Sequence, residues 1–269
     1  MTMAFSERRI LSSKDINLEI PCFAFKPNVW TEVFLTGMDK VPVKNKNVVE
    51  IGVGTGIAAI DLLKRGVGKY VGLDIDQRVV AIARYNIEKT IPESIKNVRL
   101  LQSDLLESIA VDNSYDVICG CLPQVGKPEM IKLGVDDSYS RYFDTNKYQS
   151  ALNIYGLGLN EAALVQAKTR LKKDGSIVLV LSGQSGKNIL NQMYHRYGYS
   201  TRILFEGSMP QPCEITLKKL IEAEKQGYDV FFYKDIKCQK RISIKEAENR
   251  RIKNIDSFSK IYVMEGKLT

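Results

Sequence analysis

The stretch Val48-Val-Glu-Ile-Gly-Val-Gly-Thr-Gly56 decides the fold, because in it a buried strand runs straight into a glycine-rich turn. The apolar run predicts a strand over residues 47–51, and a helix is expected over residues 57–64. Glycine lets the backbone turn sharply and approach a ligand with no Cβ in the way. The free N–H groups at the start of the helix would face the same place. This order of elements indicates a nucleotide-binding α/β unit.

The spacing of the glycines separates two classes of ligand. A dinucleotide fingerprint has the spacing G-x-G-x-x-G, whereas Gly52, Gly54 and Gly56 have the spacing G-x-G-x-G and follow an acid at Glu50. This pattern resembles motif I of the class I S-adenosylmethionine-dependent methyltransferases. A tight strand-to-helix turn without a ligand would use the same glycines, so the motif alone leaves both interpretations open.

Two more acids follow predicted strands. Asp74 ends a strand over residues 69–73, and its carboxylate can accept hydrogen bonds from both ribose hydroxyls. Asp104 follows a strand over residues 98–102, in a position to contact an adenine amino group. Each acid alone could instead cap a helix. Together they indicate S-adenosylmethionine, held by Glu50, Gly52, Gly54, Gly56, Asp74, Ile75, Asp104 and Leu105, with Trp30 and Thr31 closing over its methionine end.

Strands alternate with helices along most of the chain, which predicts a Rossmann-like, doubly wound α/β fold. We expect a mostly parallel sheet with helices on both faces, an N-terminal helical lead-in and a helical insertion before the last strand. The predicted divisions are a lead-in (1–45), a cofactor-binding core (46–206), and the insertion with the last strand (207–269). The later elements are expected as a helix over 157–172 and strands over 176–181, 200–205 and 260–264.

The fourth predicted strand ends in Cys119-Gly-Cys-Leu-Pro-Gln-Val125. In methyltransferases this position lies beside the reacting methyl group. The enzymes that methylate amino groups of DNA and of protein glutamine carry Asn/Asp-Pro-Pro-aromatic there, and this chain has neither the Asn/Asp nor the final aromatic residue. A proline-fixed loop of packing value only is the alternative. The segment resembles the Gly-Cys-Ile-Pro-Gln-Ile motif of methionine S-methyltransferases.

That resemblance is patchy but covers most of the chain. It includes the stretches 25–30, 72–76, 103–106, 155–159 and 220–232. The plant enzymes also carry a large C-terminal aminotransferase-like region, so this chain is expected to correspond to their methyltransferase domain alone. The loop over 126–147 matches poorly and departs from the family pattern.

The resemblance implies methyl transfer to the thioether sulfur of methionine or a related small molecule. A thioether has no proton to lose, so alignment and exclusion of water would carry the catalysis. The expected reacting edge consists of Cys121, Leu122, Pro123 and Gln124. Arg141 is a candidate to hold a substrate carboxylate, and Tyr142 a candidate to hold its ammonium group.

Other functions keep the same cofactor. The cofactor's own amine could close a small ring and release methylthioadenosine, which would make the protein a cyclase. A nitrogen or RNA methyltransferase could use the basic region from Lys234 to Lys260, which has nine basic and four acidic side chains. A solvated surface explains those charges as well, and the aromatic interleaving typical of base stacking is thin there. A cofactor-sensing module without catalytic activity is a further alternative.

Composition sets the remaining expectations. With 269 residues, 44% of them hydrophobic, the chain can build a sizeable core, which excludes disorder as its main state. There is no apolar run long enough for a membrane span and no signal peptide pattern, so a cytoplasmic location is expected. Five widely spaced cysteines and one histidine (His195) favour free thiols over a metal site. A nucleic-acid partner is not expected, and the oligomeric state stays open.

Overall fold

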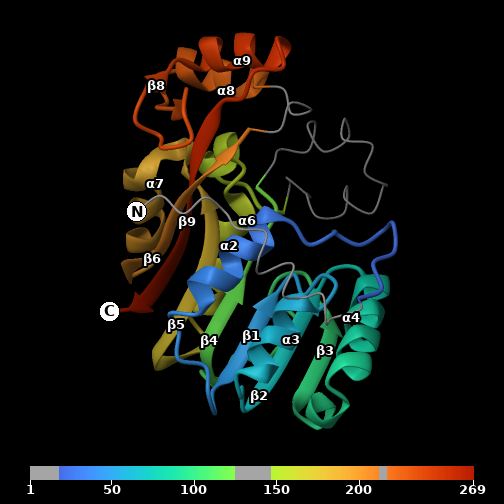
Figure 1. The fold of residues 1–269 in the computed structure, drawn as a ribbon. Coiled ribbons are helices and arrows are strands. Elements are labelled where there is room, and N and C mark those ends of the chain that lie inside the picture. The colour runs from blue at the N-terminus through green and yellow to red at the C-terminus, as the bar shows by residue number, and fades with distance from the viewer. Residues whose placement is uncertain (1–17, 125–146, 212–216) are drawn as a thin grey trace.

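The computed structural model describes residues 18–124, 147–211 and 217–269 (Figure 1). A nine-stranded sheet runs through the molecule in the order β3-β2-β1-β4-β5-β9-β7-β8, and β6 also pairs with β9. The strands are β1 (Asn47–Ile51), β2 (Lys69–Asp74), β3 (Val98–Gln102), β4 (Tyr115–Gly120), β5 (Leu171–Ser182), β6 (Tyr199–Pro210), β7 (Phe232–Tyr233), β8 (Arg241–Ile242) and β9 (Phe258–Leu268).

Seven α-helices and three short 3₁₀-helices lie within the described residues. The α-helices are α2 (Val29–Met38), α3 (Ile57–Lys64), α4 (Gln77–Thr90), α6 (Gly158–Ala167), α7 (Gly186–Arg196), α8 (Lys218–Lys225) and α9 (Ile244–Ile252). The 3₁₀-helices are η2 (Pro92–Asn97), η4 (Ala151–Tyr155) and η5 (Gly183–Ser185).

The first five strands form a parallel half-sheet whose order reverses between β1 and β4. The chain runs outward from β1 to β2 and β3, and then returns to place β4 on the other side of β1. In open α/β sheets such a reversal opens a crevice outside the carboxyl ends of the strands, where ligands bind. The topology therefore puts the ligand edge where the glycine turn after β1 lies.

The other half of the sheet is antiparallel. β9 pairs antiparallel with both β5 and β6, so β5 and β6 run in the same direction. The carboxyl ends of β5 and β6, and the start of β9, consequently lie at the ligand edge. The expected mostly parallel sheet is confirmed for β1 to β5, and the antiparallel edge extends it.

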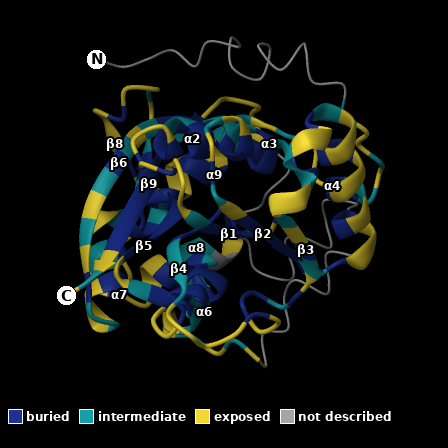
Figure 2. Cartoon of the chain, turned by 90° about the horizontal axis from the view of Figure 1, so that it is seen from below, coloured by how far each residue is buried: buried dark blue, intermediate teal, exposed yellow. Residues whose placement is uncertain are grey.

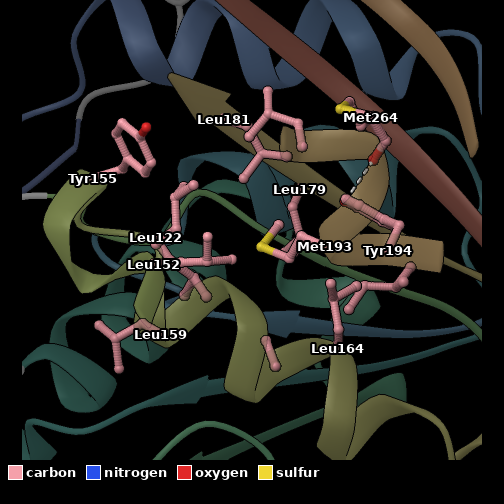
Figure 3. Packing of buried hydrophobic residues seen from close by; sticks show 14 of the residues in the cluster. Leu122, Leu152, Tyr155, Leu159, Leu164, Leu179, Leu181, Met193, Tyr194 and Met264 are labelled. Carbon is pink, nitrogen blue, oxygen red and sulfur yellow. Dashed lines mark hydrogen bonds between the residues drawn. The ribbon is translucent and has the colours of Figure 1, made fainter. Parts of the chain in front are cut away.

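Two apolar cores cover the two faces of the sheet. Along β1, Val48 packs into the core under α2, α3 and α4, whereas Val49 packs into the core under α6 and α7. This alternation follows from the period of two in a strand. Figure 2 shows the sheet buried between helices whose outer faces are exposed. Figure 3 shows the second core, where Leu164, Leu179 and Tyr194 pack against one another.

The helical lead-in and the helical insertion predicted from the sequence both form. Asn28 caps α2 in a capping box with Thr31, and Gly37 lets α2 lie against Val263 of β9. The insertion between β6 and β9 carries α8 and α9, which lie beyond the sheet at the end toward which the parallel strands point (Figure 1). The division into three parts at residues 45 and 206 stays a prediction.

Four predicted elements have wrong boundaries. The helix expected to reach residue 172 ends at Ala167, because Leu171 already pairs with Tyr115 in the sheet. β5 therefore begins five residues before the predicted strand at 176. β6 and β9 continue well beyond the expected strands over 200–205 and 260–264, because they pair with each other along their whole length. Long-range pairing overrides local propensity in each case.

Helices within residues 18–124, 147–211 and 217–269 are all too short or too polar to cross a membrane.

Candidate active site

A cavity of about 360 Å³ opens at the ligand edge of the sheet. This volume lies in the range of small-molecule sites, which is roughly 300–1,000 Å³. Its walls come from the lead-in, the turn after β1, the end of β2, the segment after β4, η4, and the ends of β5, β6 and β9. The predicted site residues in its lining are Trp30, Thr31, Glu50, Gly52, Gly54, Asp74, Cys121, Leu122, Pro123 and Gln124.

The glycine turn forms an open cradle on the floor of the cavity. Gly52 and Gly54 have φ angles of +75° and +54°, which L side chains rarely adopt. A Cβ at either position would meet no atom closer than 3.8 Å, so the space above the turn is free for a ligand. The amides of Gly52 and Val53 both donate to the carbonyl of Leu73 at 2.8 Å, which fixes the turn to β2.

Asp74 stands at the end of β2 with its carboxylate held by backbone groups. The amide of Gly54 donates to Oδ2 at 3.1 Å, and the amide of Asp76 donates to Oδ1 at 3.2 Å. Each carboxylate oxygen can accept a further hydrogen bond. The side chain is buried yet lines the cavity, so it fits the ribose hydroxyls expected there.

Glu50 is buried beside this cradle, and its carboxyl group bonds a side-chain hydroxyl where that of Asp74 bonds backbone amides. The hydroxyl of Tyr70 donates a short hydrogen bond to its Oε2. Burial raises the pKa of Glu50 to about 8, against the opposing effect of the Tyr70 hydrogen bond, and the nearby Asp74 adds to the rise. The carboxyl is therefore ready to ionise next to a cation, and S-adenosylmethionine carries a sulfonium and an ammonium group.

The segment after β4 presents apolar and neutral groups to the cavity. The side-chain amide of Gln124 donates to the carbonyl of Val180 at 2.7 Å and accepts from the amide of Ser182 at 2.8 Å. Both ends of this amide are thus engaged with β5. Burial raises the pKa of the Cys121 thiol to about 12, so the thiol stays protonated at neutral pH.

Several predicted site residues do not line the cavity. Gly56 forms the start of α3, where a Cβ would meet the backbone of Ala83 at 3.2 Å. Asp104 accepts from Lys147 Nζ at 2.6 Å and from the Tyr148 hydroxyl at 2.7 Å. Leu105 is buried in the core, and Ile75 is also absent from the lining. The cofactor roles of these residues stay predictions. Arg141 and Tyr142 lie outside the described residues.

Two sets of residues at the site lie outside the motifs that the sequence presents. Asn86 of α4 is fully buried and ties the lead-in to the glycine turn: its amide donates to the carbonyls of Thr55 and Glu19. A buried Asn on the predicted apolar face of α4 was the available signal. The second set lies at the ends of β5, β6 and β9 and contains Ser182, Gln184, Met209, Gln211 and Ser259. A correct length for β6 would have placed Gln211 at the ligand edge.

Comparison with known proteins agrees with this architecture. Residues 48–133 match the family model described as a methyltransferase domain. Methionine S-methyltransferase of Zea mays is 27% identical over 247 residues, which cover 81% of this chain and 22% of that protein. A putative protein N5-glutamine methyltransferase of Methanocaldococcus jannaschii is 30% identical over 186 residues, 68% of this chain and 85% of that protein.

Solved structures share the fold at low identity. Precorrin 8W decarboxylase from Methanobacterium thermoautotrophicum matches with a TM-score of 0.52 and 13% identity, covering 93% of this chain and 97% of that one. A putative methyltransferase from Bacillus halodurans matches with a TM-score of 0.50 and 14% identity, covering 88% of this chain and all of that one.

The fold and the site define a class I S-adenosylmethionine-dependent methyltransferase, and the chain belongs to this family. It is an enzyme that uses S-adenosylmethionine as methyl donor. The chain spans under a quarter, 22%, of the length of the Zea mays methionine S-methyltransferase that it matches.

Proposed function

We propose that this protein methylates the thioether sulfur of methionine or of a related amino acid and so forms a sulfonium product. The observation that carries the proposal is the reacting edge. The amide of Gln124 is bonded at both ends to β5, and the Cys121 thiol is protonated at neutral pH. Among Cys121, Leu122, Pro123 and Gln124, which form the reacting edge, no side chain offers a proton acceptor or an unengaged amide to the acceptor.

A sulfur acceptor suits such an edge. S-adenosylmethionine supplies an electrophilic methyl group attached to a positively charged sulfur. The neutral thioether sulfur attacks the methyl group with a lone pair, the bond between the methyl group and the donor sulfur breaks, and S-adenosylhomocysteine leaves. The acceptor sulfur takes over the positive charge, so no proton has to leave and no general base is needed. The residues of this chain then have two tasks, which are to align the acceptor and to exclude water. Trp30, Phe34 and Leu122 supply apolar walls for the second task.

The charges of the cavity fit a donor and an acceptor of this kind. Glu50 and Asp74 are its only carboxylates among the described lining residues, and both come from the cradle end. An ionised Glu50 favours the cationic donor over its neutral product, S-adenosylhomocysteine. The rest of the described lining is uncharged apart from Lys26, which suits an acceptor without net charge.

An amide nitrogen is the competing acceptor, since one relative is named a putative protein N5-glutamine methyltransferase. A planar nitrogen has to be held by a polar side chain while it loses a proton. Cys121 stands where that family carries Asn or Asp, and its protonated thiol offers no carboxylate or amide oxygen to hold the nitrogen. Gln124 stands at the aromatic position, and its amide is already engaged with β5. Ring closure within the cofactor would need the same donor site and no acceptor site.

Product analysis tests the proposal. The enzyme is incubated with methyl-labelled S-adenosylmethionine and a panel of amino acids and glutamine-containing peptides, and products are identified by mass. We expect S-methylmethionine, or the sulfonium form of a related thioether amino acid, together with S-adenosylhomocysteine. Label in the peptides would replace the proposal with nitrogen transfer. Methylthioadenosine without a methylated acceptor would replace it with cyclisation.

A further inference from the structure

Two glutamines lie side by side at the antiparallel end of the cavity. Gln184 belongs to η5, directly after β5, and Gln211 directly follows β6. β5 and β6 run in the same direction on either side of β9, so both side chains come to the ligand edge. Both line the cavity that also contains Glu50 and Asp74.

One hydrogen bond orients the pair. The side-chain nitrogen Nε2 of Gln184 donates to Oε1 of Gln211 at 2.8 Å. This bond leaves the side-chain oxygen Oε1 of Gln184 and the side-chain nitrogen Nε2 of Gln211 without another side-chain bond among the described residues. The pair therefore offers one acceptor and one donor next to each other.

The backbone holds both glutamines in place. The backbone carbonyl of Gln184 accepts from the amide of Phe231 at 2.9 Å, and the backbone amide of Gln184 donates to the Ser182 hydroxyl at 3.4 Å. The amide of Gln211 donates to the carbonyl of Ser257 at 2.7 Å. Such anchoring lowers the entropy cost of holding a ligand, because the polar groups are preorganised.

The part of the cavity lining that the structure describes on β5, β6 and β9, beside the pair, carries no charged side chain. The charged side chains in the described lining are Lys26, Glu50 and Asp74, and none of them comes from β5, β6 or β9. The neighbours on these strands are Ser182, Met209 and Ser259. A ligand here has to be neutral overall, yet it should present a donor and an acceptor close together. The head group of a zwitterionic α-amino acid has both properties.

We propose that Gln184 and Gln211 are the specificity-determining residues that hold the amino-acid head group of the acceptor. The side-chain oxygen Oε1 of Gln184 accepts a hydrogen bond from the ammonium group, and the side-chain nitrogen Nε2 of Gln211 donates one to the carboxylate. This assignment rests on the proposed function, because it takes the acceptor to be a free amino acid. It replaces Arg141 and Tyr142 with two neutral amides as the expected anchors.

Binding of norleucine tests the assignment without methyl transfer. Norleucine has the length of methionine but no sulfur, so it reports head-group recognition alone. Its dissociation constant is measured by calorimetry on the full chain saturated with S-adenosylhomocysteine. Gln184→Met and Gln211→Met keep the length of the side chain and remove its polar atoms. Gln239→Met, at an exposed position, is the matched control.

We expect norleucine to bind about tenfold or more weakly to each cavity variant, because hydrogen bonds to charged groups are the stronger ones. The control and the affinity for S-adenosylhomocysteine should not change. Unchanged norleucine affinity in both cavity variants would overturn the assignment. Weaker binding of S-adenosylhomocysteine instead would also overturn it, since the pair would then hold the amino-acid end of the cofactor.

Turnover of two truncated thioethers separates the roles of the two residues. Gln211→Met should raise KM for 4-(methylthio)butanoate and not for 3-(methylthio)propylamine, whereas Gln184→Met should do the reverse. Gln211→Glu should shift the preference toward the amine, a change that unfolding cannot imitate. Equal effects on both compounds would contradict the assignment. Norleucine binding without turnover of any thioether would leave the assignment standing and remove the proposed function.

Discussion

Asp74 and Glu50 are both buried carboxylates at the cavity, yet they differ in what holds their charge. Two backbone amides donate to Asp74, whereas one phenol hydroxyl donates to Glu50. The two backbone amides fix the position of the Asp74 carboxyl group, whose oxygens can accept hydrogen bonds from ribose hydroxyls. Glu50 has a pKa near 8 and is poised to ionise when a cation arrives.

Replacing Asp74 with alanine should weaken S-adenosylmethionine binding. The mutation removes a charged acceptor for two hydroxyls, worth on the order of 2–3 kcal/mol, or about a hundredfold in affinity. Calorimetry on the folded variant measures this loss. Asp174→Ala is the control, since Asp174 is exposed near the start of β5, away from the ligand edge. Equal affinity in the two variants would mean that the ribose is held elsewhere.

Glu50 should make cofactor binding depend on pH. Its carboxyl is mostly protonated below a pKa of about 8 in the free protein. A bound cation favours the ionised form, so binding should release up to one proton below pH 8. Affinity should then rise by up to about tenfold per pH unit and level off above pH 8. Titrations in two buffers of different ionisation enthalpy measure the released proton, and Glu50→Gln should release less.

The same pKa gives the sign of a stability effect. Glu50 has a higher pKa folded than unfolded, so the folded state binds more protons between pH 4.5 and 8. Its contribution to the free energy of unfolding is therefore greatest at low pH and is lost as the pH rises to about 8. Thermal unfolding without cofactor should show a smaller fall over this interval in Glu50→Gln. Equal falls in the two proteins would contradict the raised pKa.

η5 contains both a tightly packed glycine, Gly183, and a residue proposed to bind the acceptor, Gln184. Gly183 begins it, and a Cβ there would lie 2.9 Å from the carbonyl oxygen of Lys260 and 2.9 Å from the ring of Tyr262. Because a backbone atom is involved, Gly183→Ala should displace η5 and with it Gln184. We expect a loss of about 1–3 kcal/mol in stability and a raised KM for the acceptor, with cofactor affinity little changed.

A second glycine supplies the control for this variant. Gly227 follows α8 at φ +89° with no atom within 4 Å of an added Cβ, so alanine there costs stability through backbone strain alone. Gly227→Ala should therefore lower the melting temperature without raising KM. A raised KM in both variants would attribute the effect of Gly183→Ala to general destabilisation.

The elements also show what the sequence could and could not predict. Strands with two buried faces and a glycine turn, such as 47–51, were predicted at their true bounds because their signal is local. The helix predicted to reach residue 172 ends at Ala167. Its end is set by the pairing of Leu171 with Tyr115 and by the ion pair of Lys172 with Asp116. Such contacts join residues more than 50 positions apart, and no local pattern contains them.

The candidate site divides in the same way at the scale of the molecule. Glu50, Gly52, Gly54 and Asp74 belong to local motifs and line the cavity, and their cofactor-binding roles stay predictions. The Gln184–Gln211 pair depends on the register of β9 between β5 and β6, which becomes visible only in the folded sheet. Residues after antiparallel strands carried no motif that would have singled them out.

The basic region is another property of the whole molecule. Many of its cations are used inside the structure: Arg251 pairs with Glu248, Lys260 with Glu206, and Arg250 donates to the carbonyl of Asp256. These contacts account for part of the charge of the region, and the absence of a nucleic-acid partner stays a prediction.

Turnover with methionine tests how the titrating groups act together. With both substrates saturating, we expect kcat to change by less than about twofold from pH 6.5 to 8.5, because a thioether carries no titrating proton. Glu50 should not disturb this profile, since the bound cation keeps it ionised. At low cofactor concentration the rate should instead rise toward pH 8, following the affinity. Glu50→Gln should flatten that second profile and leave the first one unchanged.

An amine acceptor behaves differently, because only its neutral form attacks. A rise in kcat of about tenfold per pH unit at saturation would therefore exclude sulfur as the acceptor.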